Sequence, residues 1–542
     1  MAERITGIQV HEEVGAGQSM VRAPVAVTAF VGRALRGPLN RPVTLQSFSD
    51  YQRIFGGLWQ PSTLSYAVEQ FFDSGGTEAI VVRVANDARP CSLELPAGRY
   101  VLRLLALQPG TREYLRAAVD YDGIGENETD RFNLVVQRVR VPGSEHIEDQ
   151  EIYRRLSVDP SSSRHVASAL AGSQLVRMGG PVPPIRPDVV TAPGRSGLAG
   201  YVLSNADGDD GGPLTDYDII GSAAGETGLF ALAGAPAFNF LCIPPPGRDT
   251  DLGPSALLVA HRYCRDRRAM LVVDPPAAWQ SAADALAAMR DWPLASESAF
   301  MYFPRLLAYD KLRGRFEAFA PCGAVAGMLA RAAAQRPVWA AAADEALLRP
   351  GLRPLCTVTG AERLRLAAAG VNVLHGLRPQ GDVAPPACTL AGAGAAQEQR
   401  LLGARRLTLM ILDTVERGTR WMLFEPNGPA LWRKALAQVS ALFAGLAEEG
   451  AFADADAAGG TPWFAVCDER INRARERDRG VVNLLFGFAP GGAGRVQAYL
   501  LTHRAGGSRV KPVTLNRLHG GHIEEQIVVE DEELPAVVVG AK

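Results

Sequence analysis

The chain has 542 residues, with 56 Lys plus Arg against 58 Asp plus Glu, and 47% of its residues are hydrophobic. This length predicts about three domains, and the composition is that of a globular protein with enough apolar side chains for buried cores. The net charge of −2 excludes a global basic field, so neither nucleic acid nor an anionic membrane is an expected partner.

The cysteines and the apolar segments indicate the compartment. Seven cysteines stand singly along the chain without a CxxC pair, which argues against a disulfide framework and a zinc site and favours a reducing cytoplasm. The opening residues MAERITGIQVHEE are acidic where a secretory signal needs an apolar run. The most apolar long stretch, 322–348, is broken by arginines, a proline and an aspartate, so we expect no membrane insertion.

The N-terminal part predicts an arm followed by an α/β domain. In residues 1–20, Ile8 and Val10 alternate with polar neighbours before a flexible GAGQS break, which predicts an extended arm. Residues 21–85 then show strand, helix and strand patterns, the unit of a mostly parallel sheet covered by helices. The expected elements are strands at 25–31 and 79–84 and helices at 48–55 and 64–72.

Residues 86–200 differ in sequence pattern from the α/β segment before them. They predict an inserted β-rich domain on a flexible Pro/Gly-rich tether. The α/β pattern resumes in 201–375 and completes the core domain. The elements expected in these two parts are strands at 99–107, 132–141, 238–243, 269–273 and 299–303 and helices at 163–174, 257–266 and 323–331.

The C-terminal third predicts a further domain. Residues 376–397 are a Pro/Gly/Ala-rich linker, 398–503 form the domain and 504–542 form a tail. A helix is expected at 429–449 and strands at 463–467, 481–488 and 496–502.

Catalytic patterns are weak in this sequence. A serine hydrolase needs a nucleophile, a histidine base and a carboxylate in one cleft. The sequence has no GxSxG elbow and no recognisable setting for its eight histidines. Asp274 ends the strand expected at 269–273, where an α/β enzyme could place a carboxylate, but the two prolines after it favour a strand-ending turn.

Three polar segments match binding motifs only in part. The glycine-rich 221–228 lacks the lysine of a phosphate-binding loop. Segment 205–216 is rich in Asp and Gly, but Asp210 stands where a calcium loop requires glycine, which favours a solvated loop. His519 and His522 flank two glycines, which favours a surface tail over a metal site. We therefore expect no catalytic residue, metal or cofactor.

Several long segments resemble the contractile tail sheath family of phages and bacterial injection systems. Near the N-terminus they are TAFVGRALRGPLNRPVTLQSFSDYQRIFGG and LSYAVEQFFDSGGTEAIVVRV. In the middle they are YDIIG, TGLFALAGAPAFNFLCIPPP, RRAMLVVDPP, SAFMYFPRL and FAPCGAVAGMLAR, and near the end VERGTRWMLFEPNGPALW, WFAVCDE and NLLFGFAP. They keep the family's order and cover roughly three-fifths of the chain. Residues 86–200, 376–397 and the tail do not match.

The resemblance implies a fold and a role. The fold would be a subtilisin-like α/β central domain with an inserted β-rich domain, an α+β C-terminal domain, and extended terminal arms. The subunit would polymerise helically as hexameric rings around an inner tube and contract to drive the tube through a target envelope. Implied partners are further copies, the inner tube protein, and baseplate and terminator proteins, in a particle assembled in the bacterial cytoplasm. The alternatives are an α/β hydrolase of subtilisin-like topology and a non-contractile coat.

Strand exchange between subunits, which the resemblance implies, gives the first site prediction. Donor candidates are 5–14, ahead of a glycine hinge at 15–17, and 496–502, whereas a disordered terminus is the plain alternative for 1–14. The accepting sheet would come from 463–467 and 481–488. The arm residues are Ile5, Ile8, Val10, Val14, Val496, Tyr499 and Leu500, and the sheet residues are Trp463, Phe464, Val466, Val481, Leu484 and Phe486.

An arginine-rich segment gives the second site prediction. The resemblance implies that the C-terminal domain faces the inner tube, although the segment 468–480 departs from the family's usual sequence. Its alternating charges suit a weak, screened contact with an acidic tube, and a solvated loop is the alternative. The arginines are Arg470, Arg473, Arg475, Arg477 and Arg479.

Overall fold

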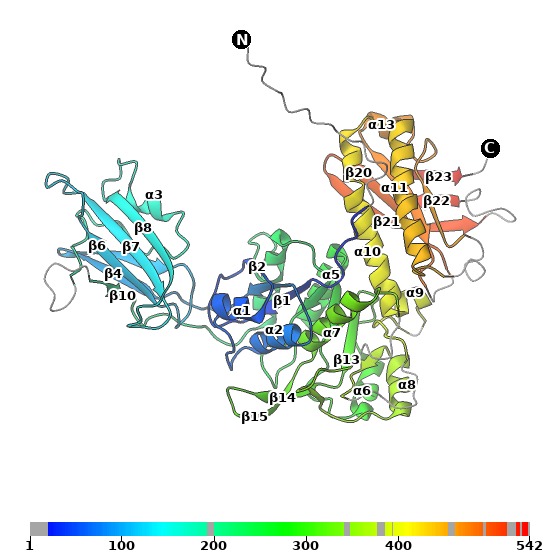
Figure 1. Ribbon diagram of the computed structural model, residues 1–542, viewed down its shortest axis with the longest axis horizontal. Helices are drawn as coiled ribbons and strands as arrows, with labels where there is room; N and C mark the ends of the chain where they lie inside the picture. The colour runs from blue at the N-terminus through cyan, green and yellow to red at the C-terminus, as the bar shows by residue number, and fades with distance from the viewer. Residues whose placement is uncertain are drawn as a thin grey trace, which may run out of the picture. The chain divides into compact units, whose positions relative to one another are not determined.

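The computed structural model describes residues 20–191, 200–340, 347–376, 385–392, 394–453, 461–491, 495–517, 527–531 and 534–539. The chain forms two compact units (Figure 1). The larger unit comprises Ala26–Ala332 and Asp344–Pro385, and the smaller comprises Met1–Val25, Ala333–Ala343 and Pro386–Lys542. The predicted arm residues Ile5, Ile8, Val10 and Val14 and the segment with His519 and His522 lie outside the described residues.

A seven-stranded sheet is the centre of the larger unit. Its order is β17-β13-β12-β11-β1-β3-β2, and only β2 runs antiparallel to its neighbour. The parallel strands are buried on both faces, as their continuous apolar sequences require. The strands are β1 (Thr28–Gly32), β2 (Pro42–Leu45), β3 (Ala79–Arg83), β11 (Phe240–Cys242), β12 (Met270–Val273), β13 (Ala299–Phe303) and β17 (Val371–Val373).

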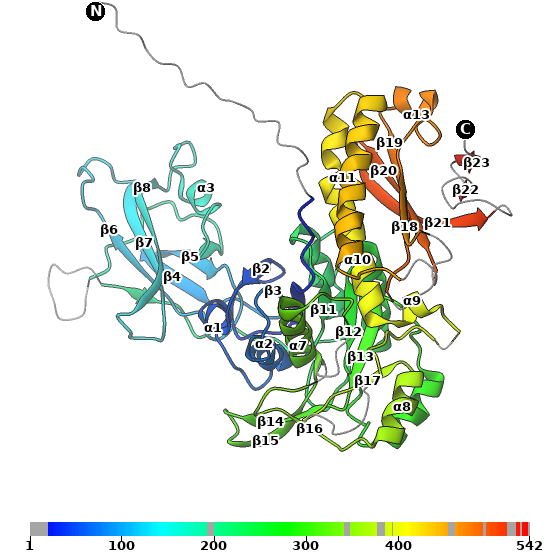
Figure 2. The ribbon, with the colours of Figure 1, turned by 45° about the vertical axis from the view of Figure 1, so that its right-hand side comes forward.

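Helices accompany this sheet, and two of them make a close contact. A Cβ atom at Gly323 of α7 would lie 2.0 Å from the carbonyl oxygen of Ala67 in α2, so only glycine permits this approach. Figure 2 shows α2 and α7 side by side. The helices are α1 (Phe48–Phe55), α2 (Thr63–Asp73), α4 (Asp216–Ile220), η1 (Gly228–Gly234), α5 (Pro254–Arg267), α6 (Ala282–Ala288), η2 (Met289–Asp291), α7 (Cys322–Gln335) and α8 (Gly360–Ala368).

Residues between β3 and α4 form two antiparallel sheets, ordered β10-β6-β7-β8 and β4-β5-β9. They share an apolar core that includes the fully buried Leu104, Phe132 and Leu134. The helix expected at 163–174 shrinks to α3, because the Ser173 hydroxyl accepts hydrogen bonds from the backbone N–H groups of residues 175 and 176. The elements are β4 (Ser92–Ala97), β5 (Tyr100–Ala106), β6 (Leu115–Asp120), β7 (Arg131–Val139), β8 (Ile147–Ser157), α3 (Val166–Leu170), β9 (Val176–Met178) and β10 (Val202–Leu203).

The junction at which the chain leaves β3 and enters this insertion is held by arginines. The predicted Pro/Gly-rich tether, 179–197, lies at the other end of the insertion and stays a prediction. Arg83, at the end of β3, is 1% exposed and donates hydrogen bonds of 2.8 Å to the carbonyls of Gly37 and Pro109. Arg36 pairs with Glu148 of β8 at 2.7 Å. A buried guanidinium bound to two carbonyls fixes the chain that enters the insertion.

A short three-stranded sheet also belongs to the larger unit, in the order β15-β14-β16. Strands β14 and β15 form a hairpin in which Leu306 opposes Phe319. The strands are β14 (Leu306–Asp310), β15 (Arg315–Phe319) and β16 (Arg353–Pro354).

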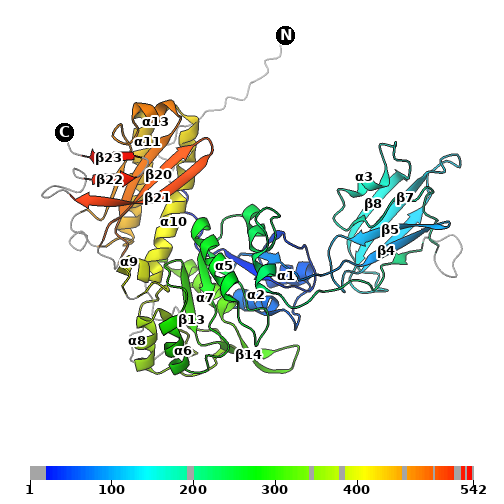
Figure 3. The ribbon, with the colours of Figure 1, turned by 180° about the vertical axis from the view of Figure 1, so that it is seen from behind.

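The smaller unit contains a six-stranded sheet in sequence order, β18 to β23, whose strands are all antiparallel. Its long helices α10 and α11 share an apolar core with one face of the sheet, and Figure 3 shows β20 and β21 beside them. The elements are α9 (Gln397–Arg400), α10 (Leu402–Gly418), η3 (Arg420–Phe424), α11 (Pro429–Glu448), β18 (Trp463–Val466), α13 (Ala474–Asp478), β19 (Val482–Phe488), β20 (Gln497–Arg504), β21 (Gly507–Arg517), β22 (Ile527–Asp531) and β23 (Leu534–Val539).

Together these sheets and helices confirm the prediction of a mixed α/β chain. Within the described ranges, no helix has the length and apolar character that crossing a bilayer requires.

Candidate assembly interface

Strand β18 has one open edge in the described part of the chain. It pairs with β19 in the register Phe464 to Gly487 and Ala465 to Phe486, and no other described strand pairs with it. An unpaired edge presents backbone N–H and C=O groups that can bind an added strand. This edge therefore has the chemistry of an acceptor.

The ladder geometry shows which backbone groups face that edge. The N–H of Ala489 donates to the carbonyl of Pro462, which marks these two residues as a hydrogen-bonded pair. Such pairs alternate along antiparallel strands, so residues 464 and 466 bond to β19. The N–H and C=O groups of Trp463 and Ala465 consequently face the open edge.

Most predicted acceptor residues lie together in this sheet. Leu484 and Phe486 face α10 and α11, whereas Phe464 and Val466 lie in a smaller apolar cluster with Leu500. The two predicted residues Trp463 and Val481 are half-buried, and Val481 precedes the first residue of β19. A Cβ atom at Gly487 would lie 2.3 Å from Phe464, so glycine at this position lets Phe464 pack across the strand pair.

The prediction that 496–502 is a donated strand is wrong in this structure. Tyr499 and Leu500 lie in β20, an interior strand that pairs with β19 on one side and β21 on the other. Val496 directly precedes it. Because both edges of β20 are occupied within the chain, the segment completes its own sheet.

No strand was predicted in the tail, yet the sheet continues into it. Strand β21 pairs with β20 through the tight turn at Gly507, where φ is 125°, and β22 and β23 follow. The repeated Val residues of 527–531 and 534–539 were the signal that could have revealed these strands.

The arginine-rich segment is a charged surface loop around α13. Arg473, Arg475, Arg477 and Arg479 are exposed, whereas Arg470 is half-buried and pairs with Asp468. The guanidinium of Arg477 lies 6.0 Å from the ring of Trp432. Four exposed guanidinium groups are thus available for an acidic partner.

Asp274 serves as a helix cap in this structure. Its Oδ1 accepts a 2.8 Å hydrogen bond from the N–H of Cys322, the first residue of α7. Burial raises the pKa of Asp274 to about 6, although the bond from Cys322 opposes that rise. The carboxylate therefore complements the positive end of α7.

The acidic loop 205–216 joins the insertion to the core. Asp207 accepts hydrogen bonds from Ser92, and Asp210 accepts them from Thr111. These carboxylates are engaged with hydroxyl and amide donors, which accounts for the concentration of aspartates in this loop.

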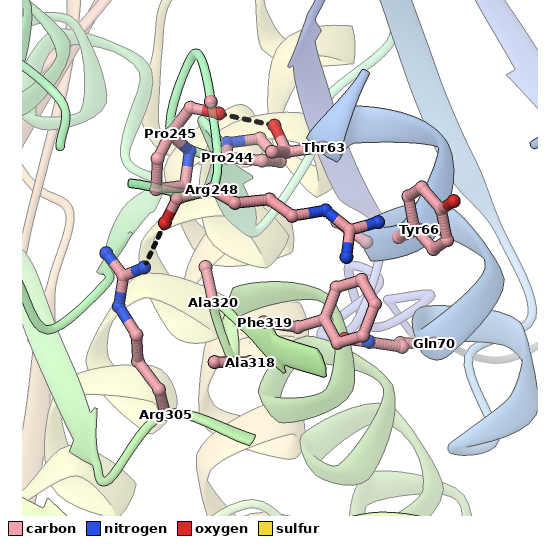
Figure 4. Close-up of a pocket in the computed structure, with 12 residues that line it drawn as sticks. Thr63, Tyr66, Gln70, Pro244, Pro245, Arg248, Arg305, Ala318, Phe319 and Ala320 are labelled. Atoms are coloured by element: carbon pink, nitrogen blue, oxygen red, sulfur yellow. Dashed lines mark hydrogen bonds between the residues drawn. The ribbon is translucent and has the colours of Figure 1, made fainter. Parts of the chain in front are cut away.

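A cavity of about 10 Å³ lies at the carboxyl edge of the parallel sheet, where α/β proteins bind ligands. The Arg248 guanidinium occupies this place, 4.9 Å from the ring centre of Tyr66 and 4.6 Å from that of Phe319 (Figure 4). It pairs with the fully buried Asp310. The remaining space has room for about one water molecule.

Comparison with solved structures identifies the architecture. A sheath tail protein from Listeria innocua matches with a TM-score of 0.57 at 12% identity, over 90% of this chain and 96% of its own. The chain has the fold of contractile tail sheath proteins. The sheath of the extracellular contractile injection system PVC, in its contracted state, matches with a TM-score of 0.52 at 15% identity, over 90% and 95% of the two chains.

A third sheath-fold neighbour is the sheath tail protein of Desulfitobacterium hafniense, with a TM-score of 0.50 at 12% identity, over 93% of this chain and 100% of its own. No protein-family model matches the chain, and no curated protein sequence matches it.

Proposed function

We propose that this protein is a structural sheath subunit that polymerises helically around an inner tube and contracts to drive the tube through a target envelope. The observation that carries the proposal is the sheath fold, which extends over 90% of the chain and 96% of the Listeria innocua sheath tail protein. A match of that extent includes both compact units. The central sheet would correspond to a subtilisin-like domain, and the insertion to an outer domain.

Assembly from one kind of subunit needs contacts that do not close on themselves, and strand addition supplies such contacts. The open edge of β18 would accept a strand from residues 5–14 of a neighbouring copy. Hexameric rings would stack through these links. The inner tube protein and the baseplate and terminator proteins would be the other partners, and the particle would form in the bacterial cytoplasm.

Negative-stain microscopy of the purified protein tests the proposal. We expect striated hollow cylinders. Monomers with esterase or protease turnover would support the hydrolase alternative, and rigid shells of invariant length would support a non-contractile coat.

The strand link makes a sharper prediction, because one substitution can block the open edge. Ala465→Pro removes an N–H that faces this edge and leaves the ladder to β19 intact. We expect the melting temperature of the variant to lie within a few degrees of that of wild type, and we expect the variant to form no cylinders. A chain that lacks residues 1–14 should likewise form no cylinders. Cylinders like those of wild type from both variants would refute strand exchange.

The exposed arginines around α13 would face an acidic tube. Replacing Arg473, Arg475, Arg477 and Arg479 with glutamate should abolish co-sedimentation of the subunit with purified tube while leaving its melting temperature unchanged, because exposed charges contribute little to stability. Tubes that become sheathed normally by the variant would contradict this assignment.

A further inference from the structure

The β14–β15 hairpin exposes a compact apolar group. Tyr309, Leu312 and Phe316 are 54%, 48% and 51% exposed. Tyr309 and Phe316 stand opposite each other in the strand register, and their rings meet edge to face with centroids 5.7 Å apart. Adjacent large apolar side chains with this exposure mark an interaction site.

The turn end of the hairpin is anchored, so this group is presented on a rigid element. Asp310 is fully buried, accepts a 3.0 Å hydrogen bond from the hydroxyl of Tyr66 and pairs with Arg248. Burial alone would raise the pKa of Asp310, but hydrogen bonds from Leu312, Arg248 and Tyr66 outweigh it and lower the pKa. The ionised pair therefore persists at neutral pH. Figure 4 shows Arg248 extended between Tyr66 and Phe319.

The same hairpin has a surplus of positive charge. Lys311, Arg313 and Arg315 surround its turn, and the guanidinium of Arg353 lies 5.6 Å from the ring of Phe316. Within the part of the chain that the structure describes, the carboxylates that pair with these exposed bases are those of Glu69 and Glu317. Aromatic and arginine side chains side by side are the usual composition of binding hot spots.

An acidic segment of the same chain complements this surface. Residues 120–130 of the insertion contain five carboxylates and no basic residue. Asp122 and Glu126 are exposed there, and neither forms an ion pair within the described part of the chain. A basic, aromatic surface and an acidic loop on one chain suit a head-to-tail contact between two copies.

We propose that the β14–β15 hairpin docks onto the acidic 120–130 loop of a second copy of this chain. The proposal rests on the self-assembly described above, since only a polymer brings the two surfaces together repeatedly. It adds an electrostatic, aromatic contact that is independent of the strand exchanged at β18.

Truncating the exposed aromatics tests the contact. Tyr309→Ser with Phe316→Ser should raise the critical concentration for cylinder formation about tenfold or more, as loss of hot-spot residues does. Tyr217→Ser, which removes an aromatic that is 85% exposed elsewhere, is the matched control and should assemble as wild type does. Wild-type protein without cylinders would refute the sheath proposal, whereas equal critical concentrations for the double variant and wild type would refute only the hairpin contact.

A charge exchange identifies the partner surface. Lys311→Glu with Arg313→Glu should raise the critical concentration for cylinder formation, and mixing with a subunit that carries Asp122→Lys and Glu126→Lys should lower it again. A photo-crosslinking residue at position 316 should label residues 120–130 of another copy. Crosslinks confined to another surface, or no rescue in the mixture, would overturn the assignment.

Discussion

At the scale of single residues, His503 is a fully buried histidine without a carboxylate partner among its described hydrogen bonds. Its Nε2 lies 2.8 Å from the hydroxyl of Thr419, and its Nδ1 lies 2.6 Å from the hydroxyl of Ser508. Burial lowers the pKa of His503 to about 4, helped by the charge of Arg420 and opposed by that of Glu416. The folded protein therefore holds a neutral imidazole over most of the acid range.

This histidine should make stability depend on pH. Between pH 6.5 and about pH 4 the unfolded chain binds a proton that the folded chain does not, so the free energy of unfolding falls as pH falls through this window. The expected loss is on the order of 1–3 kcal/mol. His503→Gln should show a smaller loss than wild type in chemical denaturation at pH 7 and pH 4.5. Equal losses in the two proteins would show that His503 does not titrate differently on folding.

At the scale of elements, the sequence predicted strands and helices whose signals are local. Strand β13 and helix α1 have the predicted bounds, because an apolar run ends at Pro304 in one and a Ser47 cap begins the other. The acceptor strands β18 and β19 were also found from their apolar sequences. Local patterns are sufficient where an apolar run or a capping residue marks the bounds of an element.

What the sequence did not predict depends on partners far along the chain. The pattern of 496–502 identifies a strand but not its neighbours, so a donor and an interior strand look alike until β21 is placed beside β20. The pair of Arg248 with Asp310 joins residues 62 positions apart, and neither has a local signal. Arg83 likewise has the sequence pattern of a polar residue at the end of a strand, although it is buried and donates a hydrogen bond to the carbonyl of Pro109.

At the scale of the whole molecule, the insertion has a core of its own and is fixed to the α/β core by specific arginine contacts. A domain with its own core can be removed without exposing the core of its neighbour. Removal leaves Arg83 with the carbonyl of Gly37 but without that of Pro109, and a buried guanidinium that loses one of its two acceptors is destabilising. The cost of a deletion therefore depends on this one side chain.

The melting temperature of a chain that lacks residues 88–198 should therefore depend on the side chain at position 83. With Arg83 retained, we expect a melting temperature several degrees below that of the same deletion combined with Arg83→Met, because methionine is an apolar side chain of similar length. The combined variant should still form cylinders through the β18 edge. The outer diameter of these cylinders should be smaller than that of wild type if the insertion covers the outside. The contact between the hairpin and residues 120–130 should be lost, which should raise the critical concentration for cylinder formation. A well-folded combined variant that forms no cylinders at any concentration would show that the insertion is itself part of the essential lattice.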